Sequence, residues 1–233
     1  MTLPHAATLH GLADWLAARL GVEDAPLLRR DGPPGVDVLA LALEPADLPA
    51  EPEADALFLH RAFRLGGSGP DERWPGLGVL ASHDPFDLQL TTGPNRALAA
   101  ALGWTQLEPL GWKGRPLGLT ATPPQRGWTA LLDALDHEFG AHEAVQAPRI
   151  PVRPRLALTN ALRPELLDLV HERGVNTCLT GQLRPGALGR ARELDIGVVA
   201  LGHRRTELWG LRQLGRELEA AFPGLVCRVY RQG

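Results

Sequence analysis

A histidine and a glutamate, separated by three residues, follow an apolar segment of this 233-residue chain. The run at 198–201 is succeeded by Gly202 and His203, and Glu207 lies one helical turn further on. The run predicts a buried strand, and the apolar spacing after Glu207 predicts a helix with Thr206 as its N-cap. Imidazole and carboxylate are common ligands of zinc, manganese and ferrous iron. The pattern is also typical of a structural histidine beside a helix-starting acid.

The same arrangement occurs a second time, earlier in the chain. An apolar run at 79–81 precedes His83, three further residues and Asp87, and a helical pattern covers 94–102. Open α/β sheets bind their ligands at the carboxyl ends of their strands. Two copies of strand, histidine–acid pair and helix therefore favour a divalent-metal site over a chance match.

The elements that must position these pairs repeat in the same order. Each half of the chain is expected to contain strand, helix, strand, helix and strand before its histidine–acid pair. The matching segments are 36–45 with 155–164, 55–60 with 176–181, and 78–87 with 197–207. Such similarity indicates a duplicated unit with right-handed crossovers. We predict an α/β fold of two similar, internally duplicated halves, residues 1–115 and 116–233, with mostly parallel mixed sheets whose strand ends face one cleft.

Further elements follow from local periodicity and composition. The additional ranges expected to be helical are 8–20, 127–139, 164–173 and a short segment before 191. The additional strands are expected near 117–119 and at 226–230, the latter as an edge strand. Residues 26–35, rich in Pro, Gly and Arg, and the glycines at 66, 67 and 69 are expected to form loops.

Composition limits the function. Hydrophobic residues make up 44% and charged residues 22% of the chain, and the net charge of −3 offers no basic field for nucleic acid. Cys178 and Cys227 lack the C-x-x-C spacing of a zinc site and fit a reducing cytoplasm. The N-terminus lacks a signal-peptide pattern, and no apolar run approaches the roughly 18 residues of a membrane span.

Two other constellations predict no chemistry. Ser82, His83 and Asp84 are consecutive, so their side chains would alternate between the faces of a strand and could not form a catalytic triad. His137 and His142 are five positions apart, which does not match the helix of a zinc protease.

Four short motifs occur in one order along most of the chain. G-H-x-x-T-E stands at 202–207, a strand with H-x-x-x-D at 78–87, an apolar strand ending in histidine at 57–60, and L-T-G-Q at 179–182. This set resembles the Nif-three-like dinuclear metal-centre family, whose members are also named GTP cyclohydrolase I type 2 homologues. G-H-x-x-T-E is the one motif that is specific by itself.

The resemblance implies a set of metal ligands. His60 corresponds to one of two adjacent histidines, and Asp87 to the aspartate that follows the third strand. His203 and Glu207 correspond to the last motif. His83 matches a position near the site, and its role as a ligand is left open. The implied cofactor is a divalent metal (zinc, manganese or iron), one or two ions per chain.

The chain departs from the family pattern at several positions. Arg61 or Leu59 stands in place of the second adjacent histidine, and the apolar run before His60 favours Arg61. Gln182 replaces the acid of T-G-E, and the W-D-N motif is not recognisable near the N-terminus. Because Arg61 would add positive charge beside the cations, we expect weaker binding of the second metal. One metal, or none, is an open alternative.

Two functions agree with these residues. The first is a metal-binding protein of the Nif-three-like type that acts as a metal-dependent hydrolase on a nucleotide or another phosphate-bearing small molecule. The second is a non-catalytic binding or scaffold protein with a degenerate one-metal or metal-free site, in which Arg61 pairs with Glu207. The resemblance implies a homo-oligomer, a hexameric ring. Neither nucleic acid nor membrane is expected as a partner, and no catalytic residue is predicted.

Overall fold

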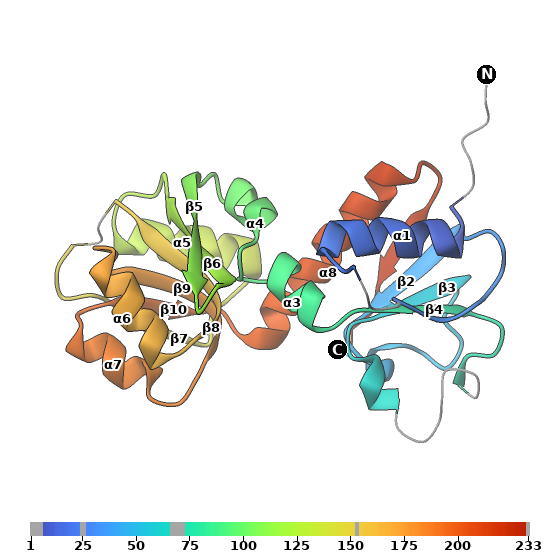
Figure 1. Ribbon diagram of the computed structural model, residues 1–233, viewed down its shortest axis with the longest axis horizontal. Helices are drawn as coiled ribbons and strands as arrows, with labels where there is room; N and C mark the ends of the chain where they lie inside the picture. Colours follow the sequence, from blue (N-terminus) through green and yellow to red (C-terminus); the bar gives the residue numbers. More distant parts are fainter. Residues whose placement is uncertain (1–6, 24–26, 66–72, 152–153, 232–233) are drawn as a thin grey trace. The chain divides into compact units, whose positions relative to one another are not determined.

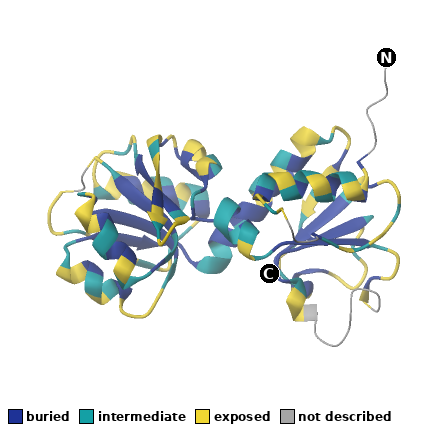
Figure 2. Ribbon diagram, in the orientation of Figure 1, coloured by how far each residue is buried: buried dark blue, intermediate teal, exposed yellow. Residues whose placement is uncertain are grey.

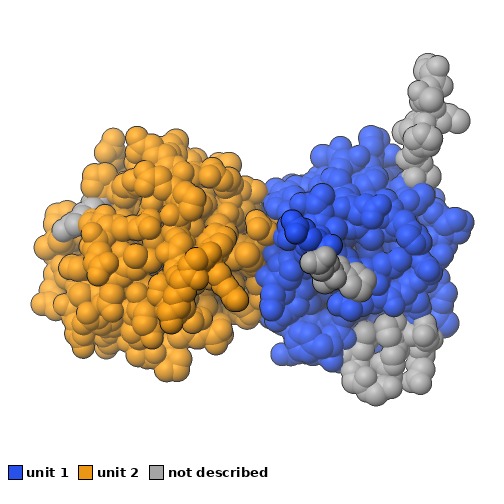
Figure 3. Space-filling view, viewed as in Figure 1, with its two compact units in different colours: residues 1–86, 210–233 blue, residues 87–209 orange. Residues whose placement is uncertain are grey.

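The computed structural model describes residues 7–23, 27–65, 73–151 and 154–231, and the chain divides into two units (Figure 3). One unit contains residues 1–86 and 210–233, and the other contains residues 87–209. The predicted halves, 1–115 and 116–233, have different bounds. The reason is that the C-terminal segment belongs to the same unit as the N-terminal residues.

The first unit is built on a mixed sheet with the strand order β1-β4-β3-β2-β11. Its strands are β1 (Leu28–Arg30), β2 (Val38–Ala42), β3 (Ala56–Leu59), β4 (Gly78–Ala81) and β11 (Val226–Val229). All neighbouring strands run parallel except β1, which is antiparallel to β4. Helix α1 (Leu9–Leu20) lies beside α8 (His203–Ala221), and an ion pair of 2.5 Å joins Arg19 to Glu217 (Figure 1).

The second unit is built on a mixed sheet with the strand order β5-β6-β8-β9-β10-β7. Its strands are β5 (Thr105–Trp112), β6 (Arg115–Thr122), β7 (Ala144–Gln146), β8 (Leu156–Leu162), β9 (Thr177–Leu183) and β10 (Gly197–Ala200). Its helices include α4 (Arg96–Ala101), α5 (Trp128–Phe139), α6 (Pro164–Glu172) and α7 (Ala187–Glu193). Alternate residues of β8 pack on α5 and on α6, so helices cover both faces of this sheet.

The predicted repeat is visible in the pairing of the strands. In the first unit, β2, β3 and β4 lie side by side in chain order and run parallel. In the second, β8, β9 and β10 do the same. A helix follows each set directly, α3 (Asp84–Leu90) after β4 and α8 after β10. The α/β class with mixed sheets is confirmed, although antiparallel pairing is commoner than parallel in the second sheet.

Burial explains why these strands are continuously apolar. Every residue of β3, β4 and β10 is buried, and the strands form the dark interior of each unit in Figure 2. Parallel strands covered on both faces lose the alternation of apolar and polar residues, because neither face meets water. The apolar runs that predicted strands therefore also locate the core.

Several expectations about local structure were wrong. Residues 28–30 form β1 rather than loop, and α3, β5 and β7 were not predicted from the sequence. Pro85 lies in the first turn of α3, where its missing N–H leaves no hydrogen bond unmade. Thr206 is not an N-cap, since α8 already begins at His203. The glycines at 66, 67 and 69 lie outside the described residues. None of the helices in the described ranges is long and apolar enough to span a bilayer.

Candidate metal centre

His203 and Glu207 lie on the same face of the first turn of α8, because residues four apart are neighbours on a helix. His203 Nε2 is 3.1 Å from Glu207 Oε1, and the Glu207 side chain is fully buried. Asp87, from helix α3, completes the group. Each of these three residues offers one ligand atom, and the atoms lie within 4.8 Å of one another.

Glycines allow this turn to form. Gly202 has a φ of +101°, which ends β10 and lets α8 begin at the next residue. Thr206 donates its hydroxyl hydrogen bond to the His203 carbonyl, 2.8 Å away. At Gly181, in β9, a Cβ atom would lie 2.7 Å from the Thr206 hydroxyl oxygen, so only glycine allows the strand to approach α8 so closely. The glycine of the L-T-G-Q motif thus has a steric role, because it allows close packing of β9 against α8.

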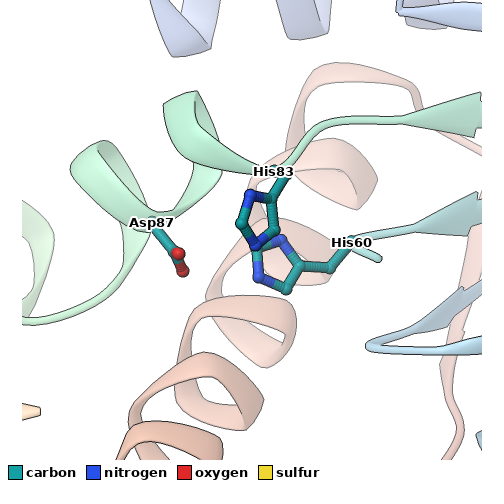
Figure 4. Close-up of side chains that lie close together, drawn as sticks. All are labelled: His60, His83 and Asp87. Atoms are coloured by element: carbon teal, nitrogen blue, oxygen red, sulfur yellow. The ribbon is translucent and has the colours of Figure 1, made fainter. Parts of the chain in front are cut away.

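A second group of ligands forms where β3 and β4 end. These strands are parallel neighbours, so His60, one residue past β3, and His83, two residues past β4, meet at one edge of the sheet. The two rings stack with their centroids 4.7 Å apart, and His60 is only 1% exposed. Asp87 lies one turn after His83 along α3, and one ligand atom from each of the three residues falls within 4.8 Å of the others (Figure 4).

Hydrogen bonds determine which nitrogen each histidine presents. His60 Nδ1 lies 3.0 Å from the Ser82 carbonyl oxygen, which can only accept, so Nδ1 carries the proton. His83 Nδ1 lies 2.7 Å from Asp84 Oδ1, which in the same way favours a proton on Nδ1. In both rings Nε2 is then the nitrogen that can bind a metal. A partner of this kind on the second nitrogen is usual for metal-binding histidines.

These donors fit a divalent cation. Two carboxylate oxygens within 4.8 Å repel each other by about 3 kcal/mol at an effective dielectric constant near 20, and a cation between them reverses the sign of that interaction. Among the described residues, His203 Nδ1 is buried and has no hydrogen-bond partner. A mixed set of imidazole and carboxylate suits zinc, manganese or iron.

Neither cysteine contributes to these groups. Burial raises the pKa of the Cys178 thiol to about 12, and burial together with Glu219 raises the pKa of Cys227 to about 12. Both are therefore protonated at neutral pH, whereas a metal requires the thiolate.

Residues 75–231 match the model of the family described as Duf34/NIF3 (NGG1p interacting factor 3). The chain belongs to the Duf34/NIF3 family. A Pseudomonas aeruginosa protein named GTP cyclohydrolase 1 type 2 homolog is 31% identical over 229 residues, 91% of this chain and 87% of the relative. A Deinococcus radiodurans protein of the same name is 28% identical over 193 residues, 78% and 73% of the two chains.

The fold of the family is also found here. A solved Bacillus cereus structure described as related to NIF3 superposes with a TM-score of 0.65 and 12% identity, over 96% of each chain. At this identity the likeness concerns the fold alone. The Nif-three-like resemblance and the fold class expected from sequence are confirmed.

The structure places all four predicted ligands in the two groups, His60 in one, His203 and Glu207 in the other, and Asp87 in both. Their binding of metal stays a prediction. His83, left open by the sequence, is in the first group. Asp84 and the Ser82 carbonyl were not predicted as partners of the histidines, although the adjacency of His83 and Asp84 was a signal.

The departures from the NIF3 pattern have local explanations. Leu59 is fully buried and belongs to the core, which supports Arg61 as the residue in place of the second histidine. Arg61 Nη1 donates to Glu44 Oε1 at 3.0 Å, and Arg64 pairs with the other oxygen of this carboxylate, so Glu44 offsets only part of the positive charge that was expected to weaken a second metal. Gln182 is half-buried after Gly181, and its backbone amide donates to the Thr180 hydroxyl oxygen.

Proposed function

We propose that this NIF3-family chain binds divalent metal through His60, His83, Asp87, His203 and Glu207, with up to two ions per chain. The observation that carries the proposal is that Asp87 stands in both groups of potential ligands. A carboxylate has two oxygens and can bind one ion with each. Each group supplies three protein ligands, the number typical of catalytic sites that keep a position open for water or substrate.

We further propose that the chain is a metal-dependent hydrolase of a nucleotide or another phosphate-bearing small molecule. The name of the curated relatives, GTP cyclohydrolase 1 type 2 homolog, supports a nucleotide. A bound divalent cation supplies an acidified water and polarises the scissile group. The chain contributes orientation, since the Ser82 carbonyl and Asp84 hold the imidazoles of His60 and His83 in place.

A second candidate is a non-catalytic binding or scaffold protein with one metal or none. It is favoured by the side chains at two positions, Arg61 and Gln182, where the family pattern has a histidine and an acid. Arg61 cannot replace a neutral imidazole ligand, and Gln182 cannot replace a carboxylate ligand. In this function the remaining ligands would have a structural role or would hold a single ion.

Metal analysis distinguishes these candidates. The protein is purified without chelator, and its zinc, manganese and iron are measured by plasma emission before and after stripping and reloading. We expect one to two ions per chain, and metal-dependent release of phosphate or of a ring-opened product from GTP. Metal uptake without turnover of GTP or of other nucleotides would support the binding protein. No uptake by the wild type, or uptake that Asp87→Asn leaves unchanged, would contradict the metal function.

Oligomerisation and location stay predictions. The resemblance implies a hexameric ring, which sedimentation of the full chain would test. The two cysteines, free in this structure, agree with the expected cytoplasmic location.

A further inference from the structure

A pocket of about 410 Å³ lies at the strand ends of the first unit. Its lining residues come from β1 and from the segments that end or follow β3 and β4: Arg29, His60, Ala62, Phe63, Ala81, Ser82 and His83. This volume is within the range of small-molecule sites, roughly 300–1,000 Å³. Because His60 and His83 line it, a molecule in the pocket lies beside the first group of potential metal ligands.

The polar groups of the pocket suit an anion. Ser82 is 5% exposed, and its hydroxyl oxygen is buried with no hydrogen-bond partner in the described part of the chain. A buried hydroxyl without a partner is unusual, and an oxygen of a ligand would satisfy it. Arg29 is an exposed cation that likewise has no partner among the described residues. Arginine binds phosphate and carboxylate groups through two parallel hydrogen bonds.

The apolar part of the pocket suits a flat body. Phe63 is 67% exposed, and its ring meets His83 edge-on, with 5.2 Å between centroids and 89° between planes. An exposed phenylalanine beside a pocket offers the face of its ring for stacking, and such exposed aromatic surface is typical of binding sites. Ala62 and Ala81 add apolar lining, and among the described residues no carboxylate lines the pocket to repel an anion.

We infer that this pocket binds a small molecule that carries an oxyanion, phosphate or carboxylate, on a flat apolar body. Arg29 and Ser82 bind the oxyanion, and Phe63 stacks on the body. That this small molecule is the substrate rests on the proposed function. That it binds here depends on the pocket alone.

The test is calorimetric titration of the full-length chain, zinc-loaded and chelator-stripped, with phenyl phosphate, benzoate and inorganic phosphate. We expect one of the two aromatic anions to bind at least tenfold more tightly than inorganic phosphate, and the tighter one identifies the oxyanion. Arg29→Gln should weaken binding of that anion about tenfold, and Ser82→Ala a few-fold. Phe63→Ala should remove the preference over inorganic phosphate and leave inorganic phosphate unchanged.

Matched controls lie elsewhere on the surface. Arg126→Gln removes an exposed arginine and Val226→Ala trims an exposed apolar residue, and both should bind like wild type. If binding requires zinc but is unchanged in the Arg29, Ser82 and Phe63 variants, the inference about the pocket is overturned and the proposed metal function stands. Binding that depends on these residues in a protein that takes up no metal would support the pocket and contradict the metal function. Absence of binding by both aromatic anions overturns the inference.

Discussion

The two strand–histidine–acid segments have the same spacing but differ in burial. After β10 the helix begins at His203 itself, and Glu207 is fully buried beside the imidazole. After β4 the helix begins one residue past His83, whose side chain is 40% exposed, and Asp87 is half-buried. The spacing brings an imidazole and an acid together in both cases, within the first turn of α8 and across the start of α3. A buried carboxylate has lost its hydration, so its ionised form depends more on a nearby positive charge than that of a half-buried carboxylate does.

The residue before each histidine is the source of the difference in geometry. Gly202 adopts a φ of +101°, which residues with a Cβ avoid, and this allows an abrupt change from strand to helix. Ser82 occupies the corresponding place before His83 and is not among the described residues with positive φ. Two copies of one pattern can therefore make different sites, and substitutions in both segments test the contrast.

The largest expected effect is that of Asp87→Asn, which removes the carboxylate common to both groups. We expect bound zinc or manganese, measured by plasma emission after dialysis, to fall below one ion per chain, because an amide is a neutral and weaker ligand. Asp84→Asn, three residues earlier on α3, is the matched control and should keep the wild-type stoichiometry. Full occupancy in Asp87→Asn would show that the two groups do not share this residue.

Next in size is the loss of the buried pair. Each ion present at a hundredfold excess over its dissociation constant stabilises the folded state by about 2.7 kcal/mol. The double variant His203→Ala/Glu207→Gln should lose one such contribution in thermal melts with zinc or manganese. Without metal it should melt within a few degrees of wild type, because strand-end polar residues add little to the core.

The single variant His203→Ala serves as the comparison. It leaves the buried Glu207 carboxylate without the imidazole 3.1 Å away, so it should be less stable than the double variant by roughly 1–3 kcal/mol. A large loss of stability in the metal-free double variant, with no metal-dependent shift in wild type, would instead assign this pair a structural role.

A smaller effect is expected from Gly202→Ala. Forcing a residue with a Cβ to positive φ destabilises the folded state by about 1–3 kcal/mol. Glu143, whose side chain would meet the new Cβ, is exposed and can move away, so Glu143→Ala should not rescue the variant. Ser82→Ala at the corresponding position removes a buried hydroxyl that has no hydrogen-bond partner in the described part of the chain, so it should not lower the free energy of unfolding. If urea unfolding gave the same change in free energy of unfolding for Gly202→Ala and Ser82→Ala, the proposed difference between the segments would be contradicted.

The smallest effect is that of Asp84→Asn on metal affinity. Asp84 orients His83 but its side chain is 93% exposed, so water can replace much of the contact. We expect the affinity of the first group to fall a few-fold, less than the roughly 10–100-fold loss usual for a buried partner of a ligand. Competition with a fluorescent zinc indicator measures it. A loss above a hundredfold would mean that Asp84 binds the ion itself.

The sequence predicted local structure best where one segment holds all the information. Apolar runs located the buried strands, and apolar spacing placed α1, expected at 8–20, within one residue of its bounds. It failed for β1 and β7, three-residue strands whose existence depends on a neighbouring strand. It also failed for β5, since a hairpin edge strand with largely exposed residues has no continuous apolar pattern.

The sequence by itself determined the chemistry available to this protein: the residue types, the one-turn spacing of each histidine–acid pair and the apolar strands before them. These are local properties, fixed by helical and strand periodicity. The tertiary structure decided which of these residues meet. His60 and His83 stack only because β3 and β4 pair in parallel, and Arg61 meets Glu44 only because β2 and β3 pair. Pairing between distant segments depends on burial of the whole sheet, which no single stretch of sequence encodes.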